Sequence, residues 1–181
     1  GRGGTAKFGL RLMRENLEDL MANLSRIFPG LVSDKARLEN AFGSLLYVHL
    51  SRGDKLAQAI SLIKAQQTGL WHIAPDGTEI ERLAPPQEPR YDFTQISNEV
   101  ARLEAYDAAW RNWFAVQRIT PICVAYEELQ VDPVPSLKRI CEALGIAEPD
   151  PHEVTSGVAK MSDAVNEEWA RRYRQDARTV R

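Results

Sequence analysis

Three short, largely apolar runs interrupt the mixed pattern of the chain, at residues 8–13, 45–50 and 119–126. Their apolar residues follow one another instead of alternating with polar ones. A strand covered on both faces, as in a parallel sheet, has this pattern, whereas a half-buried strand alternates. The three runs therefore predict three buried strands of a parallel sheet.

Between and after these runs, apolar residues recur at intervals typical of α-helices over most of the chain. Asn16 can cap a helix over 17–27, and Asp54 can cap a longer one that runs to about residue 70. Four more segments have a helical pattern: 33–42, 93–117, 135–144 and 163–178. Strands alternating with helices predict an α/β fold with a mainly parallel sheet flanked by helices.

Residues 74–91 break the helical pattern, because four of the ten prolines fall there together with the turn signal Asp76-Gly77. We expect a loop excursion from the domain, with room for a short hairpin. A loop of this length in a compact domain is usually a lid, a binding loop or a disordered segment.

Composition narrows the kind of protein. A chain of 20.4 kDa with 44% hydrophobic and 27% charged residues suits one domain over residues 1–181. No stretch approaches the ~20 apolar residues of a membrane span, and residues 1–7 lack the apolar core of a signal peptide, so we expect a cytoplasmic protein. A net charge of −2 provides no overall field for nucleic acid or an anionic membrane. Any anionic ligand therefore needs a local site.

The metal-binding residue types are few and dispersed. Two cysteines, Cys123 and Cys141, stand far apart, and the three histidines are His49, His72 and His152. None of these spacings matches a zinc or redox motif. We expect neither a disulfide framework nor a metal site.

Arg52 and Ser61 form a candidate phosphate clasp. Arg52 follows the second predicted strand, where α/β proteins bind ligands, and Gly53 permits a tight turn. Ser61 lies nearly two helical turns beyond Asp54 on the same helix face. A guanidinium fork and a hydroxyl suit a phosphate monoester. The alternative from these residues alone is a surface ion pair between Arg52 and Asp54.

Four stretches together carry a family resemblance. They are residues 9–13 (Gly-Leu-Arg-Leu-Met), Arg52-Gly53-Asp54 with Ile60-Ser61 and 66–71, residues 124–129 (Val-Ala-Tyr-Glu-Glu-Leu), and residues 160–173. In this order and with these gaps they resemble bacterial carbohydrate sulfotransferases of the trehalose 2-sulfotransferase type. The resemblance covers nearly the whole chain. It departs from the family at Arg11, where Lys is usual, and at Lys160, where Arg is usual.

The resemblance implies a P-loop-like sulfotransferase architecture and a donor, 3′-phosphoadenosine 5′-phosphosulfate, with adenosine 3′,5′-bisphosphate as its product and no metal. It places Arg52 and Ser61 on the donor's 3′-phosphate, Tyr126 near the nucleotide and Lys160 in the C-terminal segment over it. The implied acceptor is a carbohydrate or glycolipid hydroxyl. Trp71 and His72 are candidates for the acceptor pocket, because aromatic faces pack against sugar rings; the alternative is that Trp71 anchors the loop to the core.

Two features of the family match nothing in this chain: a first strand with the loop that cradles the 5′-phosphosulfate, and the catalytic carboxylate. We therefore assign no catalytic residue, and we expect the enzyme to be longer than this chain. The rival hypothesis is a nucleotide-binding or protein-interaction module without chemistry. The aromatic stripe of 93–117 is most simply core, but it could serve a homodimer, as in related proteins.

Overall fold

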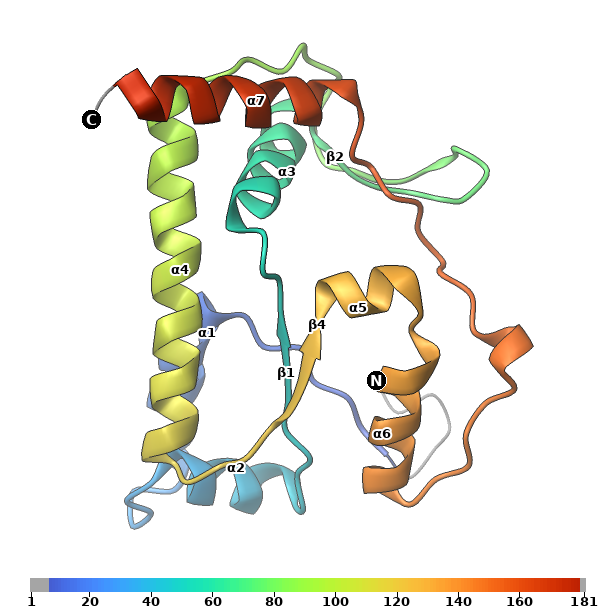
Figure 1. Cartoon of the computed structure of the whole chain (residues 1–181). Helices are drawn as coiled ribbons and strands as arrows, with labels where there is room; N and C mark the ends of the chain where they lie inside the picture. The colour runs from blue at the N-terminus through green and yellow to red at the C-terminus, as the bar shows by residue number, and fades with distance from the viewer. Residues whose placement is uncertain (1–6, 180–181) are drawn as a thin grey trace. The chain divides into compact units, whose positions relative to one another are not determined.

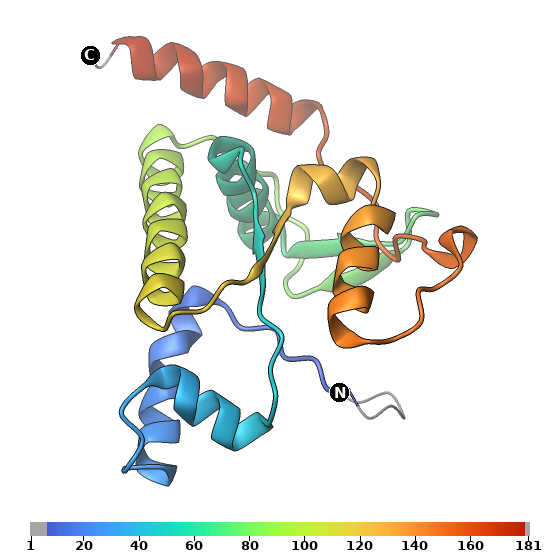
Figure 2. The same ribbon diagram turned by 60° about the horizontal axis from the view of Figure 1, so that its bottom comes forward.

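The computed structural model describes residues 7–179 and contains helices with two small sheets (Figures 1 and 2). The chain divides into two compact units. One comprises the described part of 1–47 with 106–121, and the other comprises 48–105 with the described part of 122–181. The long helix α4 (Phe93–Val116) contributes residues to both units. Among the described residues, no helix is long and apolar enough to cross a membrane.

The first unit is helical. It contains α1 (Arg14–Ile27), α2 (Asp34–Phe42) and the end of α4. Leu17, Met21 and Leu24 recur on one face of α1 and form a buried cluster with Leu38 of α2. Trp110 and Trp113 of α4 pack against this cluster. The aromatic stripe is therefore core at this end of α4.

The predicted cap of the first helix is wrong. The helix already begins at Arg14, and the Asn16 amide donates to the Met13 carbonyl at 3.1 Å, so Asn16 lies inside the first turn. By contrast, Asp54 caps its helix as predicted, because its carboxylate accepts from the Ala57 amide at 2.8 Å.

The second unit holds the parallel pair β1 (Val48–Ser51) and β4 (Ile122–Ala125), which run side by side in Figure 1. Parallel pairing of these two runs is confirmed, although each strand is only four residues long. The predicted burial on both faces is wrong for β1: Val48 is 42% and Leu50 is 58% exposed. The sheet has two strands among the described residues, and so small a sheet leaves β1 with few neighbours.

The strand predicted over 8–13 is also wrong. These residues have no regular structure, and Phe8 and Leu10 are about half exposed, at 51% and 54%. An apolar run becomes a strand only when another strand satisfies its backbone groups, and within residues 7–179 none pairs with it.

Helices α3 (Lys55–Thr68) and α7 (Ala164–Thr179) complete the core of the second unit. Its buried cluster combines Ile60 and Ile63 of α3, Ile96 of α4 and Trp169 of α7. Helix α7 packs on α3. Two predicted boundaries shift here, because α3 ends at Thr68 and the third apolar run turns into helix α5 (Tyr126–Val131).

An antiparallel hairpin follows α3 and enters the predicted loop excursion. Its strands are β2 (Leu70–Ile73) and β3 (Glu79–Arg82), joined by a turn at Asp76-Gly77. Helix α6 (Val134–Leu144) and a short 3-10 turn (Pro151–Glu153) lead to α7. The six predicted helices are thus all present, with boundaries that differ by up to three residues.

Candidate functional site

The site is organised by the ends of β1 and β4. Ser51 and Ala125 are register partners, so Arg52 and Tyr126 leave the two strands at the same edge. The Arg52 guanidinium carbon lies 4.6 Å from the centroid of the Tyr126 ring. A guanidinium stacked on an aromatic face keeps its charge and most of its hydrogen-bond donors. The Tyr126 hydroxyl accepts from Gln130 at 2.8 Å, which fixes the ring.

Glu127 ties the two strand ends together. Its Oε1 accepts from the backbone amides of Gly53 at 2.9 Å and Asp54 at 3.2 Å. The pKa of Glu127 is lowered by a hydrogen bond from its own amide, then by those from Gly53 and Asp54 and by the charge of Arg52. The residue is therefore a carboxylate at neutral pH and holds the turn that carries Arg52. Sequence reasoning missed it; its position one residue after the candidate Tyr126 was the only signal in the sequence.

For the nucleotide that the resemblance implies, adenosine 3′,5′-bisphosphate, we expect Glu127→Ala to weaken binding about three- to tenfold, because two hydrogen bonds that hold the Arg52 turn are lost at a solvent-exposed position. Calorimetric titration measures this. Glu127→Gln keeps the accepting oxygen and should bind nearly as the original protein does. Glu128→Ala, on the neighbouring exposed carboxylate, serves as the control, and an equal loss there would contradict a specific role of Glu127.

Arg52 and Ser61 line one cavity of about 250 Å³ between α3 and α7, both of which belong to the second unit. Its other lining residues are Ala57, Ser162, Asn166, Glu167, Ala170 and Arg174. The Nε of Arg52 is buried and has no hydrogen-bond partner among the described residues. Asp54 caps α3, and no ion pair joins it to Arg52 in this part of the chain. The arrangement leaves a guanidinium and a hydroxyl facing one space.

Lys160 lies apart from this arrangement. It is exposed, in the irregular segment before α7, and lines neither of the two cavities described here.

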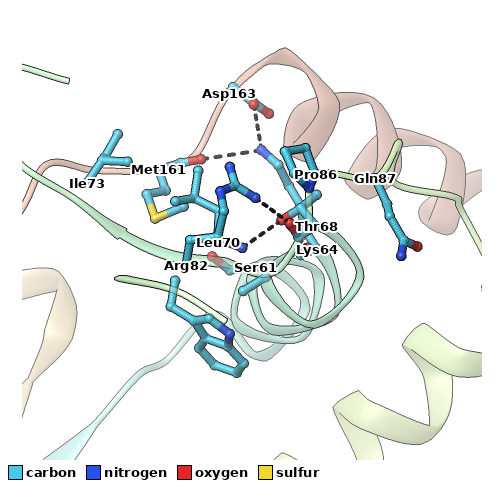
Figure 3. A pocket seen from close by; sticks show the side chains of 12 residues that line it. Ser61, Lys64, Thr68, Leu70, Ile73, Arg82, Pro86, Gln87, Met161 and Asp163 are labelled. Carbon is cyan, nitrogen blue, oxygen red and sulfur yellow. Dashed lines mark hydrogen bonds and ion pairs between the residues drawn. The ribbon is translucent and has the colours of Figure 1, made fainter. Parts of the chain in front are cut away.

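A second cavity, of about 330 Å³, shares Ser61 with the first (Figure 3). Its walls come from α3, the β2–β3 hairpin, residues 86–87 and the segment before α7. The apolar part of its lining consists of Ala65, Leu70, Trp71, Ile73, Pro86 and Met161. Much of the surface available to a ligand is therefore apolar and partly aromatic.

The charged side chains of the second cavity are paired with protein groups. Lys64 Nζ lies 2.5 Å from Asp163 Oδ2 and 3.0 Å from Asn166 Oδ1. Arg82 donates to the Thr68 carbonyl at 2.8 Å and pairs with Glu79. The dashed lines in Figure 3 mark the bonds of Lys64 to Asp163 and to the Met161 carbonyl, and the bonds that Arg82 and the Leu70 amide donate to Thr68. These groups stabilise the walls and leave little free charge for a ligand.

The structure brings Trp71 to this cavity but not His72. Neighbouring residues of a strand point to opposite faces, and His72 instead lies beside Glu81 of β3, with 2.6 Å between Nδ1 and Oε2. His72 is exposed and is absent from the cavity lining. Among the described residues, no group of three or more His, Cys, Asp or Glu side chains is placed to hold a metal ion.

Comparison with known proteins identifies the family of this chain. The family model for Stf0 sulphotransferase matches residues 1–176, so the chain belongs to the Stf0 sulphotransferase family. The family resemblance of the four sequence stretches is thereby confirmed.

Two curated relatives are similar over most of this chain. One is the trehalose 2-sulfotransferase of Mycolicibacterium smegmatis, 31% identical over 131 residues, which are 72% of this chain and 46% of the relative. The other is the trehalose 2-sulfotransferase of Mycobacterium tuberculosis, 28% identical over 133 residues, which are 73% of this chain and 46% of the relative. The matched part spans about half the length of these relatives.

Proposed function

We propose that the protein transfers a sulfuryl group from 3′-phosphoadenosine 5′-phosphosulfate to a hydroxyl of a carbohydrate or glycolipid acceptor. Family membership supports sulfuryl transfer, and the names of the relatives support a sugar acceptor. The observation that carries the choice of donor is the cavity lined by both Arg52 and Ser61, where the guanidinium is stacked on Tyr126 and its Nε has no hydrogen-bond partner among residues 7–179.

In this proposal the cavity holds the 3′-phosphate of the donor. Arg52 donates two hydrogen bonds to phosphate oxygens, and the Ser61 hydroxyl donates a third. Tyr126 supports the guanidinium from behind. Lys160 is kept as a candidate cation over the nucleotide, although its exposed position leaves it outside the cavity. A P-loop-like architecture for the complete protein likewise stays a prediction.

Trp71 is the candidate for acceptor binding. Trp71 is one of the residues that line the larger, mainly apolar cavity, and aromatic faces pack well against the C–H faces of sugars. His72 stays a weaker candidate, because it lies on the other face of β2 and contacts Glu81.

The reaction would be an in-line displacement. The acceptor oxygen forms a bond to sulfur while the bond from sulfur to the bridging phosphate oxygen breaks, and the acceptor proton passes to a base. The residues described here anchor the far end of the donor, which converts binding energy into a fixed position of the reacting group. The proposal assigns no base within this chain and requires no metal.

Transfer of label tests the proposal directly. The complete protein would be mixed with donor carrying ³⁵S in the sulfuryl group and with trehalose, other sugars and glycolipids. We expect labelled sulfate ester on at least one acceptor and a strong decrease in the Arg52→Ala variant. Absence of transfer to any acceptor, together with intact binding of adenosine 3′,5′-bisphosphate, would instead establish the non-catalytic nucleotide-binding module.

Two further expectations stay predictions: a cytoplasmic location and a homodimer through α4. Trp110 and Trp113, two of the aromatic side chains that could form such an interface, already pack inside the first unit. Light scattering of the complete protein would measure its oligomeric state.

A further inference from the structure

We propose that Arg174 of α7 is the second guanidinium of the Arg52–Ser61 cavity, and that it makes the site selective for a nucleotide with a 3′-phosphate. This inference rests on the proposed function and adds to it a residue that neither the sequence motifs nor the family resemblance identified.

The spacing of the lining residues shows that α7 turns one face toward the cavity. Asn166, Ala170 and Arg174 follow one another at intervals of four residues, and all three line it. Ala57 and Ser61 of α3 have the same interval. The alanine on each helix leaves space between the helices, and the arginines line the same space.

Packing against α3 fixes the backbone of α7, from which the exposed Arg174 side chain lines the cavity. Trp169 is only 4% exposed and packs with Ile60 and Ile63 of α3. Near the start of α7, Lys64 Nζ donates to Asn166 Oδ1 at 3.0 Å. These contacts attach α7 to the helix that carries Ser61, so the two cavity walls form one packed structure.

The charges of the cavity favour an anion. Arg174 makes no hydrogen bond or ion pair with another residue of the described part of the chain, whereas Arg172 of the same helix lies over the Tyr91 ring at 4.1 Å. The cavity lining holds two guanidinium groups, Arg52 and Arg174, and one carboxylate, Glu167. The lining therefore carries an excess of positive charge, which an anion such as a phosphate monoester would neutralise through charge-assisted hydrogen bonds.

Lys160 and Arg174 differ in their position relative to the cavity. Lys160 is exposed and lies outside the lining. Arg174, fourteen residues further along, comes from the same C-terminal part of the chain and does line it. A guanidinium also offers the bidentate geometry that a lysine lacks.

The experiment compares two nucleotides that differ in one group. Calorimetry would measure the affinity of the complete protein for adenosine 3′,5′-bisphosphate and for adenosine 5′-phosphate. We expect Arg174→Ala to lower the affinity for the bisphosphate roughly 10- to 100-fold and to leave the affinity for the monophosphate nearly unchanged. The bisphosphate affinity of Arg174→Lys should lie between those of the original protein and Arg174→Ala, because lysine keeps the charge but lacks the guanidinium fork.

Arg171→Ala is the matched control, since Arg171 lies on the same helix, is exposed and lies outside the cavity lining. Thermal unfolding verifies that each variant is folded, and Arg174→Gln, which keeps a long polar side chain, replaces the alanine variant if that one is not. Bisphosphate affinity that survives in Arg174→Ala, or that falls equally for both nucleotides, would overturn the role of Arg174 alone. An original protein that fails to prefer the bisphosphate would overturn the proposed donor as well.

Discussion

Arg52→Ala is expected to weaken binding of adenosine 3′,5′-bisphosphate by about 100-fold, equivalent to ~3 kcal/mol. The variant removes both hydrogen bonds that a guanidinium fork makes to a phosphate. It also removes the stacking partner of Tyr126, 4.6 Å away, which now supports the charge in the cavity. Calorimetric titration of the bisphosphate measures the loss.

Two companion variants separate the contributions. Arg52→Lys keeps the charge without the fork and should recover part of the affinity. Ser61→Ala should cost less than Arg52→Ala, because a neutral hydroxyl makes one weaker hydrogen bond. Unchanged affinity in Arg52→Ala would contradict the phosphate site, whereas an equal loss for adenosine 5′-phosphate would place Arg52 on another part of the nucleotide.

Gly69→Ala is expected to lower the free energy of unfolding by about 3 kcal/mol. Gly69 ends α3 with φ of +71°, a conformation that costs other residues about 1 kcal/mol. A Cβ there would lie 2.5 Å from the Ala84 carbonyl oxygen and 2.7 Å from its amide nitrogen, and backbone atoms cannot rotate away. The end of α3 and the hairpin would have to separate. Urea unfolding measures the change.

Gly145→Ala provides the matched control. Gly145 ends α6 with φ of +62°, but a Cβ there would meet no atom within 4 Å. Gly145→Ala should therefore lower the free energy of unfolding only by the backbone penalty of about 1 kcal/mol. If both glycine variants lose the same stability, the close approach of Ala84 to Gly69 adds nothing to the backbone penalty and the predicted difference is wrong.

The helices were predictable because their signals are local. Apolar spacing and caps such as Asp54 act within a few residues, so they can be read from the sequence before the fold is known. The strands were harder, because pairing decides them. The run at 45–50 found a partner in β4, while the run at 8–13 found none among the described residues and stays irregular.

The candidate site shows the same division. Arg52 and Ser61 became candidates because they lie in one short stretch, at a predicted strand end and on the helix that follows, and because that stretch carries the family resemblance. Glu127 is 74 residues from Gly53 along the chain, and its role appears only through the register of β1 and β4. Arg174 is equally remote and reaches the cavity only because α7 packs on α3.

The sequence by itself determined the helices, the Arg52 turn, the position of Ser61 and the family resemblance, because each depends on short-range order in the chain. Only the tertiary structure decided which apolar run pairs as a strand, that Trp71 and His72 lie on different sides of the hairpin, and that Glu127 and Arg174 join the site. The physical reason is that pairing and helix packing bring together residues whose separation along the chain carries no information about their separation in space.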